Sequence, residues 1–265
     1  RDHRKIVVID GKVAFTGGVN LADEYINQVE RFGHWKDVAV KVTGDAVRSF
    51  TIMFLQMWNV SEWERENYEA YLEGITYEEP LYHDGFVIPY GETPTRSVEL
   101  GKTVYASMIN SATQYVHIMT PYFIVDREFL DSMRFAARRG VEVVMILPHI
   151  PDKKIVYYIA RNYYPELLEA GIKVYEYTPG FVHAKVFVAD DINATVGTIN
   201  LDYRSFYHHF ECGAYFYDNS VIGKVEEDFQ NTLQKCMEVT PEYYKQIPLY
   251  QKLIGRIAKV IAPLM

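Results

Sequence analysis

The spacing of apolar residues changes along the chain and predicts strands and helices in turn. Residues 3–10 and the run VFVA at 186–189 are short and apolar, which is typical of buried strands. The segment VAVKVTG at 38–44 alternates between apolar and polar residues and predicts a half-buried strand. From 44 to 72 the apolar residues recur at helical spacing instead, so this stretch predicts one long amphipathic helix.

The second half of the chain alternates between strands and helices, as an α/β protein does. Its predicted strands are 115–120, 141–147, 172–177 and 211–218, and its predicted helices are 100–113, 126–139, 152–170 and 219–238. Between the halves, glycines and prolines interrupt residues 73–96 and predict a linker or surface loop. We divide the chain into a first half at 1–75, a linker at 76–97, a second half at 98–240 and a C-terminal amphipathic helix at 241–265.

One set of residues occurs twice at a constant offset. His3, Lys5, Asp10, Gly17 and Asn20 each recur 180 positions later, as His183, Lys185, Asp190, Gly197 and Asn200. Three fixed residues fall together by chance at roughly one position in ten thousand. Two copies in register therefore indicate an internal duplication. A lone strand histidine is more often structural than catalytic. The repetition reverses this expectation, because packing rarely requires costly buried charge twice.

The repeated residues suit a phosphate. On a strand, side chains at i and i+2 point to one face, so His183 and Lys185 are expected to project together, as are His3 and Lys5. An imidazole can attack phosphorus or transfer a proton, and a neighbouring ammonium can stabilise negative charge. The aspartate of each copy ends its strand, where it is expected to hold a turn or neighbouring backbone amides rather than to carry protons.

Composition sets limits on the class of protein. The chain has 265 residues, of which 49% are hydrophobic and 23% charged, as in a globular protein with a core. Its net charge of −8 argues against a nucleic-acid partner, which usually requires a basic surface. Cys212 and Cys236 show no metal-binding spacing and no disulfide framework, so a reducing compartment is expected.

The chain resembles the phospholipase D superfamily, whose defining motif is HxKxxxxD followed by GxxN, and within it the bacterial cardiolipin synthases. The likeness covers nearly the whole chain and is carried by HRKIVVIDGKVAFTGGVN at 3–20, HWKD at 34–37, TPYFIVDREF at 120–129, PGFVHAKVFVADD at 179–191 and VGTINLDYRSF at 196–206. It implies an α/β fold of duplicated mixed sheets flanked by helices. The two halves would be related by a pseudo-twofold axis, with the active site between them and the first half incomplete.

The resemblance also implies roles for residues. The implied catalytic set consists of the two motifs, His3, Lys5, Asp10, His183, Lys185 and Asp190. The implied phosphate-binding groups are Lys5, Asn20, Lys185 and Asn200. His3 is expected to form a phosphohistidine and His183 to act as acid and base, although the pseudo-symmetry leaves that order open.

In the family an acidic residue orients each motif histidine. We expect Asp37 to orient His3 and Glu211 to orient His183, although Asp37 could be an ordinary residue at a strand edge. No metal and no other cofactor is expected. The other histidines, His34, His83, His117, His149, His208 and His209, do not form a convincing metal set, and the last two are expected to be structural or to line the site.

The reaction implied by the resemblance joins two phosphatidylglycerol molecules into cardiolipin and releases glycerol. The expected partners are phosphatidylglycerol and an anionic membrane surface, and the sequence leaves the oligomeric state open. Two alternatives remain: a phospholipase D-type phosphodiesterase that hydrolyses lipid or nucleic acid, and a non-catalytic module that binds anionic lipid. The resemblance also leads us to expect a missing N-terminal portion with membrane helices and a catalytic part on the cytoplasmic side of the cell membrane.

The C-terminal stretch QKLIGRIAKVIAPLM predicts a basic amphipathic helix. Lys252, Arg256 and Lys259 recur at i, i+4 and i+7, and apolar residues fill much of the other side. Such a helix suits an anionic membrane surface. The alternative is a helix whose apolar side packs on the protein core.

Overall fold

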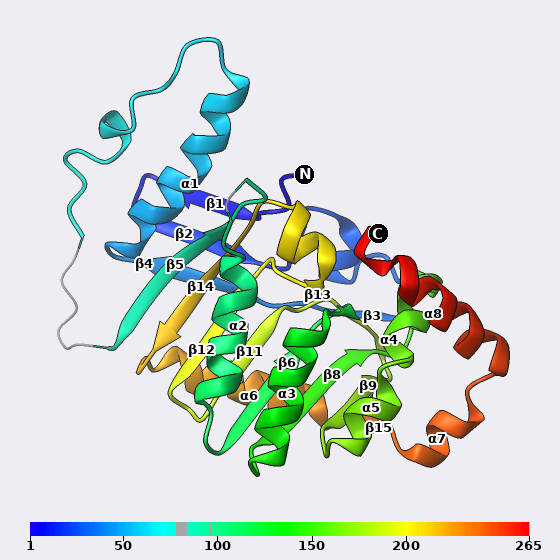
Figure 1. Cartoon of the computed structure of the whole chain (residues 1–265). Helices are drawn as coiled ribbons and strands as arrows, with labels where there is room; N and C mark the ends of the chain where they lie inside the picture. The colour runs from blue at the N-terminus through cyan, green and yellow to red at the C-terminus, as the bar shows by residue number, and fades with distance from the viewer. Residues whose placement is uncertain (78–83, 96, 265) are drawn as a thin grey trace.

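The computed structural model describes residues 1–77, 84–95 and 97–264, and its largest element is an eight-stranded mixed sheet. In spatial order the strands are β15 (Cys236–Glu238), β9 (Lys173–Tyr177), β8 (Glu142–Pro148), β6 (Tyr115–Met119), β11 (Val186–Ala189), β12 (Asn193–Gly197), β14 (Glu211–Tyr217) and β5 (Phe86–Glu92). Figure 1 shows α2 (Leu100–Ser111) and α3 (Arg127–Arg138) in front of this sheet and α6 (Val221–Leu233) behind it. Two layers of helices therefore enclose the apolar strands of the second half.

A second sheet belongs to the first half. It contains β1 (Ile6–Ile9), β2 (Val13–Gly17) and β4 (Ala39–Thr43), and α1 (Ala46–Ser61) follows it. Ala14, Val40 and Val42 of this sheet share one buried cluster with Val186 and Ala214 of the large sheet. The two halves are therefore joined through a common apolar core.

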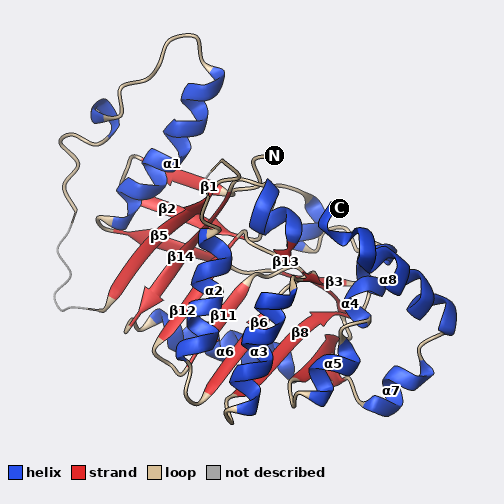
Figure 2. Cartoon of the chain, in the orientation of Figure 1, coloured by secondary structure: helices blue, strands red, loops and turns tan. Residues whose placement is uncertain are grey.

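The remaining elements connect these layers, and Figure 2 distinguishes them by type. Two short parallel pairs are formed by β3 (His34–Lys36) with β10 (Gly180–Val182) and by β7 (Phe123–Ile124) with β13 (Leu201–Asp202). The other α-helices are α4 (Lys154–Arg161), α5 (Tyr164–Glu169), α7 (Pro241–Gln246) and α8 (Leu249–Ile261). Short 3-10 helices cover Asp23–Ile26, Glu69–Tyr71 and Ala262–Leu264, and a π-helix covers Arg204–His208.

The strand register confirms the duplication. In β1 and β2, Val8 faces Ala14, and 180 positions later Val188 faces Ala194 in β11 and β12. The turn after each first strand also repeats, with φ of 53° at Asp10 and 56° at Asp190. The α/β class and the duplicated sheets predicted from the sequence are confirmed, although only the large sheet is mixed and the sheet of β1, β2 and β4 is antiparallel.

The motif glycines are needed for close approach between strands. A Cβ atom on Gly17 would lie 2.3 Å from the carbonyl oxygen of Val38, and one on Gly197 would lie 2.4 Å from the carbonyl oxygen of Cys212. Neither distance leaves room for a side chain, so each glycine lets its hairpin approach the next strand of its sheet.

The predicted linker at 76–97 is wrong in part. Residues 86–92 form β5, which pairs with the whole of β14 at the edge of the large sheet. The prolines and glycines were misleading because an edge strand has one side free of ladder bonds and tolerates Pro89. Residues 78–83, which include His83, lie outside the described part of the chain.

Several helix boundaries also differ from the prediction. The helix expected over 44–72 ends at Ser61, because the chain beyond it has no core to pack against and Trp63 is fully exposed. The stretch 152–170 forms two helices, since Pro165 fits only in the first turn of α5. The helix over 219–238 ends at Leu233 and is followed by β15, and the C-terminal segment likewise contains two helices, α7 and α8.

Asp190 fixes the start of β6, as the sequence suggested for a strand-end acid. Its carboxylate accepts backbone N–H groups from Thr113 at 2.7 Å, Gln114 at 2.9 Å and Tyr115 at 2.8 Å. Burial alone would raise the pKa of Asp190, but these backbone donors lower it. Among the described residues, the corresponding Asp10 accepts no such hydrogen bond.

We expect Asp190→Asn to destabilise the fold. The substitution removes the charge and replaces one acceptor oxygen with a donor that faces other donors, which should cost about 1.5–3 kcal/mol. The neighbouring Asp191→Asn is the control, because its exposed side chain accepts only the Tyr115 hydroxyl and asparagine tolerates its φ of 56°. Urea unfolding of both variants checks this, and equal midpoints would contradict the role given to Asp190.

Candidate active site

The second motif histidine is buried and held by an acid of the first half. His183 is 6% exposed, and its Nδ1 lies 2.8 Å from Oδ2 of Asp37. The backbone N–H of His183 also donates to the carbonyl oxygen of Lys36 at 2.7 Å. Because Nδ1–H donates to Asp37, Nε2 is the ring nitrogen that does not contact the acid, and it lies 2.9 Å from Nζ of Lys185.

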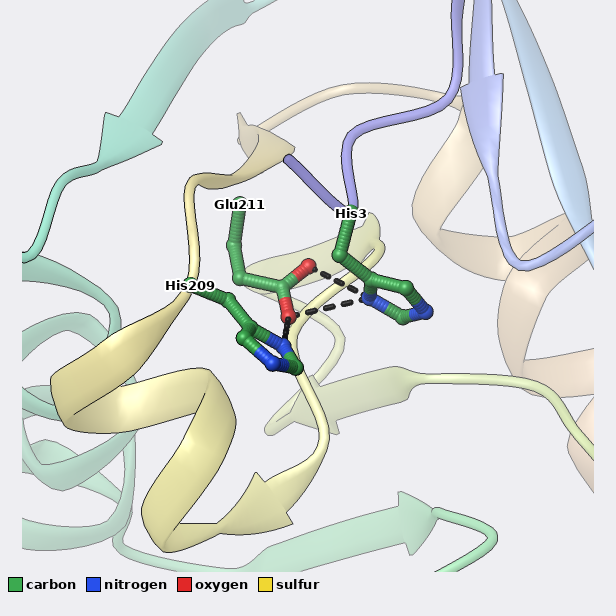
Figure 3. A group of neighbouring side chains, drawn as sticks. All are labelled: His3, His209 and Glu211. Atoms are coloured by element: carbon green, nitrogen blue, oxygen red, sulfur yellow. Dashed lines mark hydrogen bonds and ion pairs between the residues drawn. The ribbon is translucent and has the colours of Figure 1, made fainter. Parts of the chain in front are cut away.

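The first motif histidine is held in the same way by an acid of the second half (Figure 3). Nδ1 of His3 lies 2.9 Å from both carboxylate oxygens of Glu211, which is fully buried. The backbone N–H of His3 donates to the carbonyl oxygen of Phe210 at 2.9 Å. Nε2 is again the ring nitrogen that does not contact the acid.

The pairing of acids and histidines predicted from the sequence is therefore wrong, because each acid crosses to the histidine of the other half. Asp37 binds His183, and Glu211 binds His3. Asp37 and Glu211 are 174 positions apart, six fewer than the repeat offset of 180. The register confirms their equivalence, since β4 pairs with β2 at Gly17–Ala39 as β14 pairs with β12 at Gly197–Gly213.

The residues around each acid fit the length of its side chain. The carboxylate of Glu211 accepts hydrogen bonds from Thr198 Oγ1 at 2.5 Å and Ser205 Oγ at 2.9 Å. Asp37 occupies the space that a side chain at Gly18 would need, since a Cβ atom there would lie 2.0 Å from its Oδ1. Glycine at 18, where the second half has Thr198, therefore makes room for the first acid.

The two motif lysines lie beside the histidines, as the i, i+2 spacing predicted. Nζ of Lys185 is 2.8 Å from Nδ1 and 2.9 Å from Nε2 of His183, and it also donates to the His183 carbonyl. Nζ of Lys5 donates to the His3 carbonyl at 2.8 Å. The strands begin one residue later than each lysine, so histidine and lysine lie on the extended segment that enters the strand.

The two asparagines of the repeat differ in their hydrogen-bond partners. Asn200 is 5% exposed, and among the described residues its side-chain oxygen has no hydrogen-bond partner. The amide of Asn20 donates to the Tyr25 hydroxyl at 2.5 Å. Tyr25 in turn meets the His183 ring edge-on, with ring centroids 5.3 Å apart.

The centre favours an anion. Burial lowers the pKa of Lys185 to about 7, even though Asp37 opposes the shift, and burial lowers the pKa of Lys5 to about 8. Burial and the nearby Lys185 charge lower the pKa of His183 to about 4. Burial would raise the pKa of Glu211, but hydrogen bonds from His209 and His3 lower it to about 2. Burial disfavours the charged forms of the buried Lys185 and the partly buried Lys5, so a phosphate between them would stabilise both ammonium groups.

Two features of the site were missed by sequence reasoning. Trp35 and Phe181 stand beside His183, with ring centroids 5.3 and 5.9 Å away, and they supply much of its apolar surroundings. His209, which we expected to be structural or a lining residue, places Nδ1 3.4 Å from Oε1 of Glu211. Its position next to Glu211 was a weak signal, because nothing in the sequence places Glu211 beside His3.

His3, His209 and Glu211 form the one cluster among the described residues whose donor atoms are close enough to hold a metal ion. In Figure 3 the two imidazoles lie against the same carboxylate, with Glu211 between them. Both carboxylate oxygens already accept hydrogen bonds from His3 and from neighbouring hydroxyls. His3, Glu211 and the neighbouring hydroxyls therefore form one hydrogen-bond network, with His209 beside it.

This geometry defines a class of protein: a duplicated α/β fold that brings two HxKxxxxD motifs together, each histidine oriented by an acid. Residues 105–233 match the family model described as "Cardiolipin synthase, PLD-like domain". The fold resembles the crystal structure of a phosphatidylserine synthase from Haemophilus influenzae, with a TM-score of 0.70 over 99% of this chain and 69% of that one, at 17% identity. The chain belongs to the phospholipase D superfamily.

Within the superfamily, the chain is similar to bacterial cardiolipin synthases. It is 39% identical over 265 residues to a cardiolipin synthase of Alkalihalophilus pseudofirmus and 38% identical to cardiolipin synthase 2 of Bacillus cereus, covering 52% and 51% of their lengths. It is 53% identical to an uncharacterized protein of Streptococcus mutans, of which it covers 57%. The chain thus spans about half the length of these relatives.

The crossed pairing predicts that each acid controls the histidine of the other half. Asp37→Asn should lower the pKa of His183, because the carboxylate opposes the effect of burial there, and should leave His3 nearly unchanged. Glu211→Gln should lower the pKa of His3, because the Glu211 carboxylate raises it, and should leave the pKa of His183 nearly unchanged. Ring-nitrogen NMR of histidine-labelled protein measures both pKa values. An effect of Asp37→Asn on His3 alone would contradict the crossed arrangement.

The lysine environment predicts how phosphodiester binding depends on pH. In the free protein Lys185 and Lys5 lose their protons near pH 7 and 8, so attraction for a phosphodiester should fall as pH rises through this range. We expect the affinity of the site for a phosphodiester to decline from pH 7 to pH 9. Thermal melting over the same range separates this effect from unfolding. A flat profile with an intact fold would show that the lysines keep their charge.

Proposed function

We propose that the protein is a phosphatidyltransferase that makes cardiolipin from two phosphatidylglycerol molecules. One observation carries the proposal: two histidines each have Nδ1 bound to a carboxylate of the other half, which leaves Nε2 to act on a substrate, and the buried Lys185 and the partly buried Lys5 lie beside them. Such a centre can perform two successive displacements at one phosphorus atom. The similarity to cardiolipin synthases over the full chain supports phosphatidylglycerol as the substrate.

In the first step Nε2 of His3 attacks phosphorus, and the bond from phosphorus to the headgroup glycerol oxygen breaks. His183 gives its proton to the leaving oxygen, so free glycerol departs. Lys5, Lys185 and the amide of Asn200 bind the non-bridging oxygens as their charge grows. The carboxylate of Glu211 stabilises the positive charge that forms on the His3 ring.

In the second step a hydroxyl of the second phosphatidylglycerol attacks phosphorus. Its proton passes to His183, the bond between phosphorus and Nε2 breaks, and His3 is restored. His183 must be protonated to act first as an acid, yet burial and the charge of Lys185 lower its pKa to about 4. The negative charge of the bound phosphodiester is what would raise this pKa, which links proton donation to substrate binding.

Water competes with the second lipid for the phosphohistidine. Attack by water would yield phosphatidic acid, which is the reaction of the alternative phosphodiesterase. The apolar rings of Trp35 and Phe181 beside His183 limit the access of water on that side. A preference for an alcohol over water would therefore require that bound lipid excludes water from the other side of the phosphohistidine.

The full-length protein, supplied with labelled phosphatidylglycerol in vesicles, tests the proposal. We expect cardiolipin and free glycerol, without added divalent cation. His183→Ala should lower the rate by on the order of 10³-fold or more, because both proton transfers are lost. Mass spectrometry identifies the products, and Asp191→Asn is the control for a folded variant.

Other products would point to other functions. Phosphatidic acid as the sole product would mean that water is the acceptor and the protein is a phospholipase. No turnover in a folded protein that still binds the vesicles would favour a lipid-binding module.

A further inference from the structure

The C-terminal helix α8 turns its large apolar side chains away from the protein. Within α8 the exposed fraction of these side chains ranges from 41% at Ile254 to 81% at Leu249, and the others are Leu253, Ile257, Val260 and Ile261. At 3.6 residues per turn, these six side chains occupy about 140° of the helix circumference. A contiguous apolar surface of this kind is unusual on a soluble face and marks an interaction site.

The side of α8 that faces the protein carries small residues instead. Gly255, Ala258 and Ala262 are buried against the body of the second half. A Cβ atom on Gly255 would lie 2.1 Å from Nδ2 of Asn162 and 2.2 Å from the carbonyl oxygen of Tyr158. The helix therefore packs closely through backbone and small side chains, and this packing needs none of the exposed apolar residues.

Polar contacts fix α8 in this orientation. Arg161 of α4 donates to Oε1 of Gln251 at 3.3 Å, and Nζ of Lys259 lies 3.3 Å from the centroid of the Tyr163 ring. In Figure 1 α8 lies along the edge of the molecule beside α4, the helix on which it packs.

A third strip of α8 is basic. Lys252, Arg256 and Lys259 occupy the arc between the apolar and the small-residue arcs. Lys259 contacts the Tyr163 ring and Lys252 the Tyr244 ring, so Arg256 is the exposed cation of this strip. The chain as a whole has a net charge of −8, so this strip is a local exception. An apolar surface bordered by cations complements one partner in particular, a bilayer with anionic headgroups.

We propose that α8 is an interfacial helix that lies in the surface of an anionic lipid bilayer, with its apolar arc in the acyl region and its basic strip at the headgroups. Among the described residues, no helix is long and apolar enough to cross a membrane. A helix of 13 residues with three distinct arcs lies along the interface. The packing of one side of α8 on the protein agrees with the second alternative from the sequence, and the proposal assigns the exposed side to lipid.

A fluorescent probe on the apolar arc tests this in the full-length protein. Ile257→Trp places an indole where the native side chain is 63% exposed, and Phe135→Trp on α3, at 60%, is the matched control. On vesicles of equal parts phosphatidylcholine and phosphatidylglycerol, the emission of the Ile257→Trp variant should shift to the blue and be quenched by brominated acyl chains. The control should do neither.

Two results would overturn the proposal. Emission unchanged by vesicles would show that α8 stays in water. A blue shift already present without lipid would show that protein covers the arc, either another part of the chain or a second copy. Light scattering would then distinguish these two occupants.

Charge substitutions give a second measurement. Leu253→Glu with Ile257→Glu should weaken vesicle binding through α8 by about tenfold or more, and Arg256→Gln by about fivefold on anionic vesicles only. Phe135→Glu is the control. Hydrolysis or transfer of short-chain, monomeric phosphatidylglycerol should be unaffected in all of them. Loss of vesicle binding with this activity intact separates the role of α8 from the proposed chemistry, on which it does not rest.

Discussion

The crossed pairs of histidine and carboxylate are the constraint on which the site depends. Each motif histidine enters its own strand, but the acid that orients it comes from the other half, as does the carbonyl oxygen that accepts its backbone N–H. Neither half can therefore assemble a competent histidine alone. This coupling explains why the two sheets share one apolar core, because the acids must be placed to within a hydrogen-bond length across the join.

Burial and charge work together at this join. The apolar surroundings lower the pKa of both lysines and both histidines, while the two acids stay ionised through the hydrogen bonds they accept. A phosphodiester between the two lysines would stabilise their charged forms. The proposed binding of phosphate would therefore draw on these lysines, and an interfacial α8 would hold the protein at a surface of lipid headgroups.

Local sequence reasoning succeeded where the signal was local. The apolar runs that became β1 and β11, and the alternation in β4, gave correct strands, because side-chain periodicity reports burial directly. It failed at β5, where Pro89 was taken as a loop signal although an edge strand tolerates it. It also failed at the end of α1, which depends on where the core stops rather than on residues near Ser61.

The sequence by itself determined the chemistry: two copies of one motif at an offset of 180, with histidine and lysine on a common side. Only the tertiary structure decided which acid serves which histidine, that His209 joins Glu211, and that α8 faces outward. The physical reason is the same in each case. A repeat is visible in residue identities, whereas a partner distant in the chain is chosen by the packing of the two halves, which no single segment encodes.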